Sequence, residues 1–126
     1  MFIIKNSEQI MLMKKAGKIT AEALLVAREA IKPGASTKDI DREIQRYIEK
    51  CGAVPSFLGY GGFPASACIS VNNEVIHGIP SAKRILTEGD IVSVDVGARF
   101  RGYNGHSART LPVGKVSDEA LRLISV

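Results

Sequence analysis

The sequence predicts an α+β fold in which two long helices precede an antiparallel sheet. Two apolar stripes and one alternating strand support this prediction. The first stripe recurs at steps of three and four residues, as one face of a helix does, and comprises Ile10, Met13, Gly17, Thr20, Leu24, Ala27 and Ile31. The second comprises Ile40, Ile44, Tyr47 and Ile48. The strand is marked by Val92, Val94 and Val96, which alternate with other residues.

Capping residues mark the ends of both helices. Ser7 is the expected N-cap of the first helix, which Pro33-Gly34 should end. The run Ser36-Thr37-Lys38-Asp39 is typical of a capping box that starts the second helix, and Gly52 should stop it. Because few residues join the two helices, we expect an antiparallel or steeply angled pair.

Shorter elements follow the helices. We expect a strand over Ala67-Cys68-Ile69-Ser70-Val71 and a short strand or bend over Val75-Ile76-His77. The strand that returns after Asp95 should run from about Tyr103 to Val113. A third helix should start at Ser117-Asp118-Glu119; it reaches only its third turn at Val126, so we expect a chain that has been cut. The small residues Ala16, Gly17, Ala21 and Ala23 indicate close packing of the first helix against a neighbour.

Composition is that of one soluble globular domain spanning residues 1–126. The chain is 45% hydrophobic and 24% charged, with a net charge of +4. No apolar run approaches the roughly 20 residues of a membrane span, and Cys51 and Cys68 form no disulfide framework, so we expect a cytoplasmic protein. The basic residues are scattered rather than clustered, which argues against a specific nucleic-acid partner.

Asp95 and His106 are the candidate metal ligands. A carboxylate in the middle of a half-buried strand needs a partner, and a cation is the usual one. If the hairpin turn is centred between Phe100 and Arg101, Asp95 lies directly opposite His106 on one face of the sheet. Such a pair has Cβ atoms roughly 4.5–5.5 Å apart, a workable spacing for two ligands of one metal.

A set of long, ordered motifs resembles the bacterial type I methionine aminopeptidases, which are M24-type metallopeptidases. The motifs are Tyr60-Gly61-Gly62-Phe63-Pro64, Cys68-Ile69-Ser70-Val71-Asn72, Glu74-Val75-Ile76-His77-Gly78-Ile79-Pro80, Gly89-Asp90-Ile91-Val92, Val94-Asp95-Val96-Gly97, Gly102-Tyr103-Asn104-Gly105 and Ala108-Arg109-Thr110. The resemblance runs almost end to end, from the first helix to the third.

The resemblance implies half of a "pita-bread" fold, with an antiparallel sheet and two long helices packed on one of its faces. In that family two cobalt, manganese, iron or zinc ions activate a water that attacks the peptide bond after an N-terminal methionine. By position, Asp95 resembles the bridging aspartate ligand, and His77 the catalytic histidine that hydrogen-bonds the substrate. Tyr60, Phe63 and Cys68, with Phe57 beside them, resemble the walls of the methionine pocket.

Two departures from the family change the expected function. The family needs about twice this length, and the C-terminal half that supplies its remaining ligands and a second catalytic histidine is absent. His106 stands where the family has its second aspartate ligand, between Gly105 and Ser107, which both match. We therefore expect a truncated or engineered half of a methionine aminopeptidase that is inactive alone.

Three functional hypotheses remain open. The chain is an aminopeptidase half that needs a complementing second chain, a homodimer with one metal shared between two copies of Asp95 and His106, or a non-enzymatic domain that binds peptides or a partner. Two aspartates and two neutral histidines would suit a single divalent transition metal.

Each candidate residue also has a structural interpretation. Asp95 could be a buried aspartate bonded to a turn, His106 a strand-surface histidine, and His77 a polar residue at a strand end. The aromatics Phe57, Tyr60 and Phe63 could belong to the core or to an interface. Cys68 is better explained as a small buried residue than as a nucleophile, because no base adjoins it.

Overall fold

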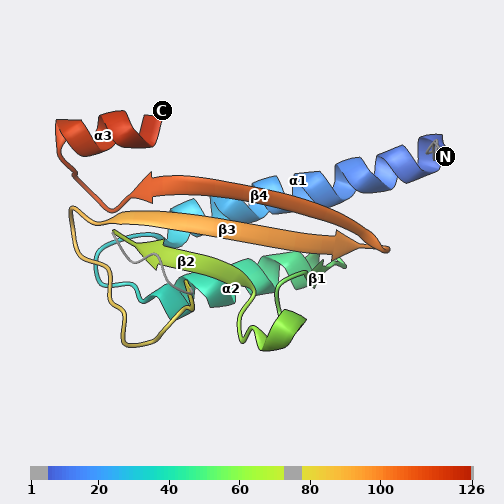
Figure 1. The fold of residues 1–126 in the computed structure, drawn as a ribbon, viewed down its shortest axis with the longest axis horizontal. Helices are drawn as coiled ribbons and strands as arrows, with labels where there is room; N and C mark the ends of the chain where they lie inside the picture. The colour runs from blue at the N-terminus through green and yellow to red at the C-terminus, as the bar shows by residue number, and fades with distance from the viewer. Residues whose placement is uncertain (1–5, 73–77, 126) are drawn as a thin grey trace.

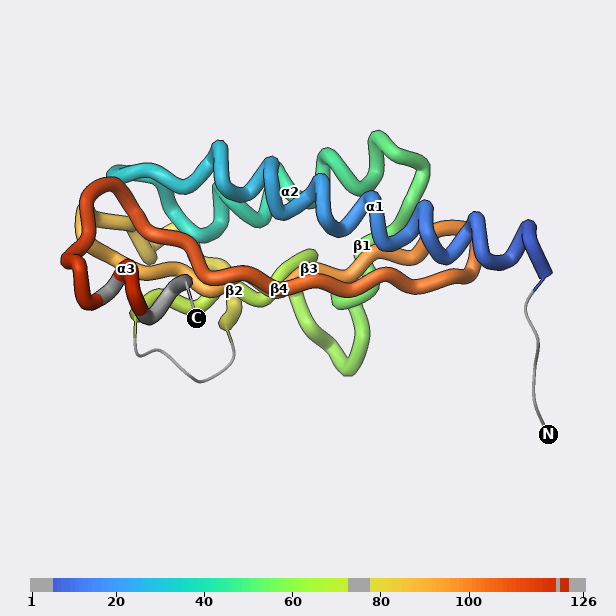
Figure 2. Tube along the Cα trace, turned by 90° about the horizontal axis from the view of Figure 1, so that it is seen from above, coloured from blue at the N-terminus to red at the C-terminus, as the bar shows by residue number. Residues whose placement is uncertain are grey.

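Two helices cover one face of a four-stranded antiparallel sheet, which confirms the expected α+β architecture (Figures 1 and 2). The computed structural model describes residues 6–72 and 78–125. Helices α1 (Ser7–Ala30) and α2 (Thr37–Lys50) form the upper layer in Figure 2, and the loop that carries the short 3₁₀ helix η1 (Tyr60–Gly62) lies beneath the sheet. A third helix, α3 (Asp118–Ser125), follows the sheet and begins where the sequence predicts.

The N-cap of α1 is Asn6, so the prediction of Ser7 is wrong by one residue. The Asn6 side chain accepts a hydrogen bond from the Gln9 backbone at 2.8 Å, and the Gln9 side chain accepts one from the Asn6 backbone at 2.9 Å. This reciprocal pair needs a three-residue spacing, which an asparagine at position 6 provides. For α2 the predicted cap is confirmed, because Ser36 and Asp39 form the same box.

Strand β3 (Ile91–Phe100) is the centre of the sheet. It pairs along its length with β4 (Tyr103–Pro112) on one side, and with β2 (Ala67–Val71) and the two-residue β1 (Val54–Pro55) on the other. The side chains of Val92, Val94, Val96 and Ala98 are buried against the helices. The opposite face, called the open face below, carries side chains from three strands: Cys68, Ser70, Ser93, Asp95, His106, Ala108 and Thr110.

The hairpin register differs from the prediction. The turn consists of Arg101 and Gly102, both at positive φ (48° and 86°), and Phe100 pairs with Tyr103. A two-residue loop with both residues at positive φ is a tight hairpin turn whose twist matches that of the strands. His106 is therefore opposite Gly97, and Asp95 is opposite Ala108. Because the error is two residues, both side chains still lie on the same face.

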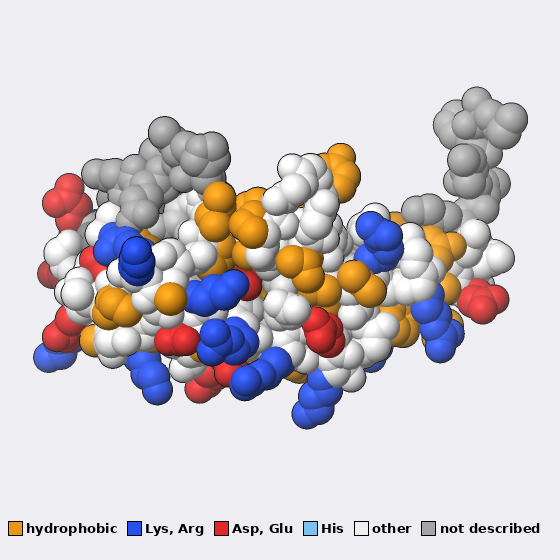
Figure 3. All heavy atoms as spheres, turned by 90° about the horizontal axis from the view of Figure 1, so that it is seen from below, with side chains coloured by type: hydrophobic (Ala, Val, Ile, Leu, Met, Phe, Trp, Pro, Cys, Tyr) orange, Lys and Arg blue, Asp and Glu red, His pale blue; other side chains and the backbone are white. Residues whose placement is uncertain are grey.

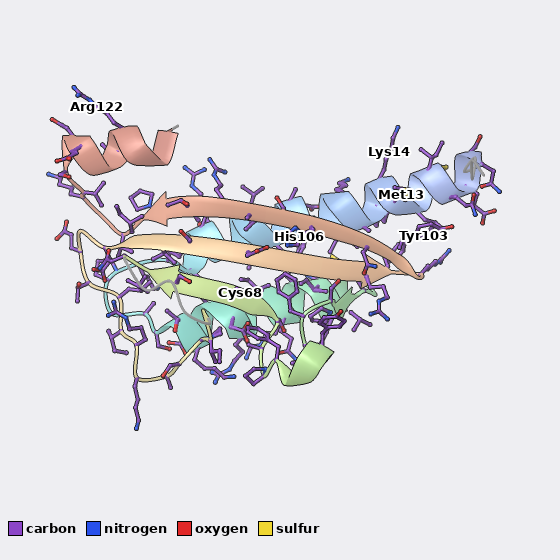
Figure 4. All side chains as sticks on the ribbon, in the orientation of Figure 1. Met13, Lys14, Cys68, Tyr103, His106 and Arg122 are labelled. Carbon is purple, nitrogen blue, oxygen red and sulfur yellow. The ribbon has the colours of Figure 1, made fainter. Side chains whose placement is uncertain are left out.

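A close contact between β4 and the backbone of α1 explains why position 105 is a glycine. A Cβ atom on Gly105 would lie 2.7 Å from the Gly17 nitrogen and nearer still to the Ala16 carbonyl group. The backbone of the strand can lie on the helix only because Gly105 has no side chain. The predicted close packing of α1 at Ala16 and Gly17 is thus confirmed, with β4 as the neighbour. In Figure 4 Met13 of α1 points toward Tyr103 of β4, one turn farther along the same contact.

No helix in the described part of the chain is both long and apolar enough to cross a membrane. The expected strand or bend over Val75-Ile76-His77 lies outside the described residues.

Candidate active site

Side chains from three strands form the candidate site at the middle of the open face. Cys68 of β2 is paired directly with Asp95 of β3, and His106 of β4 lies on the far side of β3 (Figure 4). An open hollow of about 940 Å³ runs along this face, and its lining includes Cys68, Ser70, Ser93, Asp95 and Thr110. The sheet alternation alone places these groups together, because each strand contributes every second residue to the face.

The Asp95 and His106 side chains are in direct contact. The His106 Nε2 atom lies 2.6 Å from the Asp95 Oδ1 atom, although the two residues are diagonal rather than opposite neighbours. Gly97, the residue opposite His106, has no side chain that would separate them. The Oδ1 atom is shielded from solvent, and this contact does not have the geometry of a hydrogen bond. Among the described residues Asp95 Oδ1 therefore has no hydrogen-bond partner, and a carboxylate oxygen in that state can serve as a metal ligand.

These two donors fit part of a metal site rather than a whole one. Two ligands held about 2.0–2.1 Å from one tetrahedral ion lie about 3.3 Å apart, so the imidazole must move outward by less than 1 Å to admit an ion. The exposed fractions of the side chains, 60% for His106 and 40% for Asp95, leave room for that movement. Among the described residues, no group of three or more His, Cys, Asp and Glu side chains could hold a metal. A metal bound here would need further ligands from outside the described residues.

Aromatic side chains border this pair. The Phe57 ring meets the His106 ring edge-on, with centroids 5.6 Å apart, and meets the Phe63 ring at 6.4 Å. A Cβ atom on Gly97 would lie 3.1 Å from the Ser56 Cβ atom and 3.3 Å from the Phe57 ring, so this glycine makes room for the loop that carries Phe57. Ser56 anchors the loop: its backbone N–H donates to the Gly97 carbonyl at 2.9 Å. The structure thus brings Phe57 and Phe63 to the metal-ligand candidates.

Tyr60 does not join this cluster. Its side chain is 81% exposed and stands on η1, beyond the two phenylalanines. Cys68 is half-buried, and burial raises the pKa of its thiol, as do the nearby carboxylates of Asp95 and Asp41. A thiol held in its neutral form is a poor nucleophile, which agrees with the prediction that Cys68 is not one. His77 lies outside the described residues.

Asp41 is a positioning residue that the sequence analysis missed. Its buried Oδ1 atom accepts hydrogen bonds from the backbone N–H groups of Ser66 and Ala67, both at 2.9 Å. Burial raises the pKa of Asp41, while the two hydrogen bonds act in the opposite direction. The carboxylate fixes the start of β2, and with it the position of Cys68 opposite Asp95. The available signal was a carboxylate beside Ile40 on the apolar stripe of the second helix.

Comparisons with known proteins assign the chain to a family. The model of metallopeptidase family M24 matches residues 11–126. The chain belongs to the M24 family. Curated relatives are methionine aminopeptidases from Clostridium acetobutylicum, 56% identical, and Bacillus subtilis, 48% identical; each match covers all of this chain and 50% of the relative. The chain therefore spans about half the length of the curated relatives it matches.

Solved structures give the same result. The methionine aminopeptidase of Thermotoga maritima superimposes with a TM-score of 0.93 at 42% identity, over 100% of this chain and 51% of that one. The enzyme of Rickettsia prowazekii gives 0.91 at 37% identity. More distantly, a prolidase from Pyrococcus furiosus gives 0.74 at 26% identity. The predicted resemblance and the predicted half of a pita-bread fold are confirmed. As metallopeptidases, M24 proteins imply a divalent metal.

Proposed function

We propose that this chain is the N-terminal half, in a single domain of residues 1–126, of a metal-dependent methionine aminopeptidase, and that a second polypeptide unit completes its site. The observation that carries the proposal is the Asp95–His106 contact on the open face, bordered by Phe57 and Phe63. The site has two ligand candidates in a chain that spans half of its relatives, so it needs groups that the described residues do not supply.

Asp95 and His106 would hold the metal from this side. Carboxylate and imidazole donors suit cobalt, manganese, iron or zinc, with the imidazole favouring the later members of that series. When bound, such a metal lowers the pKa of a coordinated water and polarises the scissile carbonyl. An imidazole ligates through one nitrogen and cannot bridge two ions as a carboxylate can. His106 therefore favours one ion in place of a bridged pair.

The substrate of the proposed enzyme is a peptide with an N-terminal methionine. Phe57 and Phe63 supply an apolar aromatic wall, and the neutral Cys68 thiol extends it, so a polarizable thioether finds suitable contacts beside the ligands. Tyr60 would close over this wall when substrate binds, because its exposed ring stands on the same loop. His77 is proposed to hydrogen-bond the substrate near the scissile amide.

Two sources could supply the second unit. A polypeptide equivalent to the other half of the relatives would complete the site as in a single-chain enzyme. A second copy of this chain would instead give two aspartates and two histidines, whose charge one divalent ion neutralises. We favour the homodimer, because substitution of a carboxylate by His106 reduces the repulsion between two identical halves.

Turnover tests the need for a second unit. The assay measures cleavage of a Met-Ala-Ser peptide with added cobalt or manganese. It compares two samples: this chain alone, and this chain mixed with the half of the Clostridium acetobutylicum enzyme that it does not match. Each arm is repeated with His106→Asp. We expect no turnover by this chain alone, either as a monomer or as a homodimer with one shared metal. With the added half we expect turnover that is higher for His106→Asp, because an aspartate can bridge two ions. Release of methionine by this chain alone, well above the buffer rate, would overturn the proposal.

Light scattering with and without a chelator tests the homodimer. We expect a dimer that dissociates when metal is removed and that is lost in His106→Ala. A monomer indifferent to metal would refute the shared site. Binding of the peptide without turnover in every arm would favour the alternative of a non-enzymatic binding domain, for which the exposed Tyr60 ring, on the same loop as Phe57 and Phe63, is the supporting observation.

A further inference from the structure

A second hollow lies away from the open face, between the first turns of α1 and the tip of the β3–β4 hairpin. Its volume is about 460 Å³. Met11, Leu12 and Phe100 provide its apolar part, and the remaining lining side chains are Lys14, Lys15, Lys18 and Arg101. Figure 3 shows basic and hydrophobic side chains, with an acidic one near them, at the end of the molecule where α1 begins. We call this hollow the basic groove.

The basic groove carries an excess of positive charge. No ion pair with a described carboxylate involves any of its four cationic side chains, and no acidic residue lines it. Four like charges around an apolar floor repel one another, and an anionic ligand relieves that repulsion.

Arg101 is an unusual residue for its place in the turn. The first position of this two-residue turn has φ 48°, where asparagine, aspartate or glycine is preferred. The guanidinium carbon lies 5.4 Å from the centre of the Phe100 ring, which fixes the cation at the rim of the groove. A side chain that weakens its own turn while placing a charge indicates a role other than turn stability.

We propose that the basic groove binds an acidic segment of a polypeptide that also carries apolar side chains. Carboxylates of the segment would pair with Lys15, Lys18 and Arg101. Its apolar side chains would lie on Met11, which is 70% exposed, and on Leu12. A flexible thioether adapts to side chains of different shape. Nucleic acid fits less well, because Phe100 is half-buried beneath Arg101 and offers bases no free ring to stack on.

Fluorescence anisotropy tests this proposal with a short labelled peptide in which glutamate and leucine alternate. We expect binding that weakens as ionic strength rises. The double substitution Lys15→Glu and Lys18→Glu should weaken binding about tenfold or more, since two attractions become repulsions. Arg101→Asn should weaken binding while raising the unfolding midpoint, because asparagine suits the turn. Weaker binding together with a higher unfolding midpoint would show that a ligand contact, and not the fold, has been lost.

Matched controls decide the outcome. Lys115→Glu makes the same kind of substitution at one exposed lysine beyond the other end of β4. It should leave peptide binding nearly unchanged. A peptide alternating lysine and leucine should not bind. Failure of the acidic peptide to bind, or equal binding by all variants, would overturn the proposal. Tighter binding of oligouridylate or of vesicles of an anionic phospholipid, lost in the double variant, would also overturn it. None of these outcomes depends on aminopeptidase activity.

Discussion

The geometry of the candidate site depends on two glycines, Gly97 and Gly105, because neither has a side chain. Gly97 lets the His106 ring reach Asp95 diagonally across the strand pair and leaves space for Phe57. Gly105, one residue before His106, lets β4 lie on the backbone of α1. The two glycines therefore fix the position of His106 relative to the sheet and to the helix layer.

The contact at Gly105 predicts an asymmetric result for two Gly→Ala substitutions. Gly105→Ala forces a methyl group into the α1 backbone and should lower the free energy of unfolding by about 2 kcal/mol or more. Gly17→Ala, on the facing helix, meets nothing within 4 Å and should raise it by about 0.5–1 kcal/mol. Urea denaturation followed by circular dichroism measures both. Equal effects would show that the close approach is absent.

Asp41 predicts a defined pH dependence. Asp41→Ala should lower the free energy of unfolding by about 2 kcal/mol or more, because two buried N–H groups lose their acceptor, whereas Asp41→Asn keeps an acceptor oxygen. Burial raises the pKa of folded Asp41 above its ordinary 3.8. The protonated Asp41 carboxyl therefore stabilises the folded state below pH 3.8. This stabilisation is lost as the pH rises through the pKa of folded Asp41.

Denaturation of wild type and Asp41→Asn across that pH range measures the effect. The stability of wild type relative to Asp41→Asn should fall as the pH rises from below 3.8, since the amide does not titrate. A constant difference between the two proteins would contradict the assignment of a raised pKa to Asp41.

At the scale of elements, local sequence explains where most of them begin and end. Apolar stripes locate α1 and α2, and the capping box at Ser36 and Asp39 locates the start of α2. The register of the hairpin could not be predicted in the same way, because arginine, here Arg101, is not a residue that usually marks the first position of a two-residue turn. The predicted register was therefore displaced by two residues, although the face that carries Asp95 and His106 was right.

The start of α1 can be tested by capping substitutions. Asn6→Ala should lower the free energy of unfolding by about 1 kcal/mol, because it removes the acceptor for the Gln9 N–H. Ser7→Ala should change it little, since Ser7 is the first helical residue rather than the cap. Thermal unfolding measures the two variants side by side. A larger loss for Ser7→Ala would restore the sequence-based assignment.

At the scale of the whole molecule, one face of the sheet is covered by helices (Figure 2), and the other bears Asp95 and His106, the two candidate ligands. The relatives have about twice the chain length, so the equivalent site in them can draw on a second half. The homodimer and the shared metal stay predictions, and their common consequence is stabilisation by metal.

Metal should therefore raise the unfolding temperature of this chain. At a metal concentration about 100 times the dissociation constant, the expected stabilisation is about 2.7 kcal/mol. His106→Ala and Asp95→Asn should abolish it, whereas Thr110→Ala, on the same face in β4, should retain it. Calorimetry with zinc or cobalt, before and after chelation, measures the shift. An unchanged response in His106→Ala would exclude that residue as a ligand.

The sequence by itself determined the order and type of the longer elements and the face on which Asp95 and His106 meet. These follow from apolar periodicity, from capping chemistry and from the two-residue alternation of strands, all of which are local. The family resemblance follows instead from the ordered motifs between Tyr60 and Thr110, and the short β1 and η1 were not predicted. Only the tertiary structure decided the register of the hairpin, the diagonal contact across Gly97, the fit of Gly105 on α1 and the anchoring of β2 by Asp41. These depend on backbone positions brought together from distant parts of the chain, which no local pattern specifies.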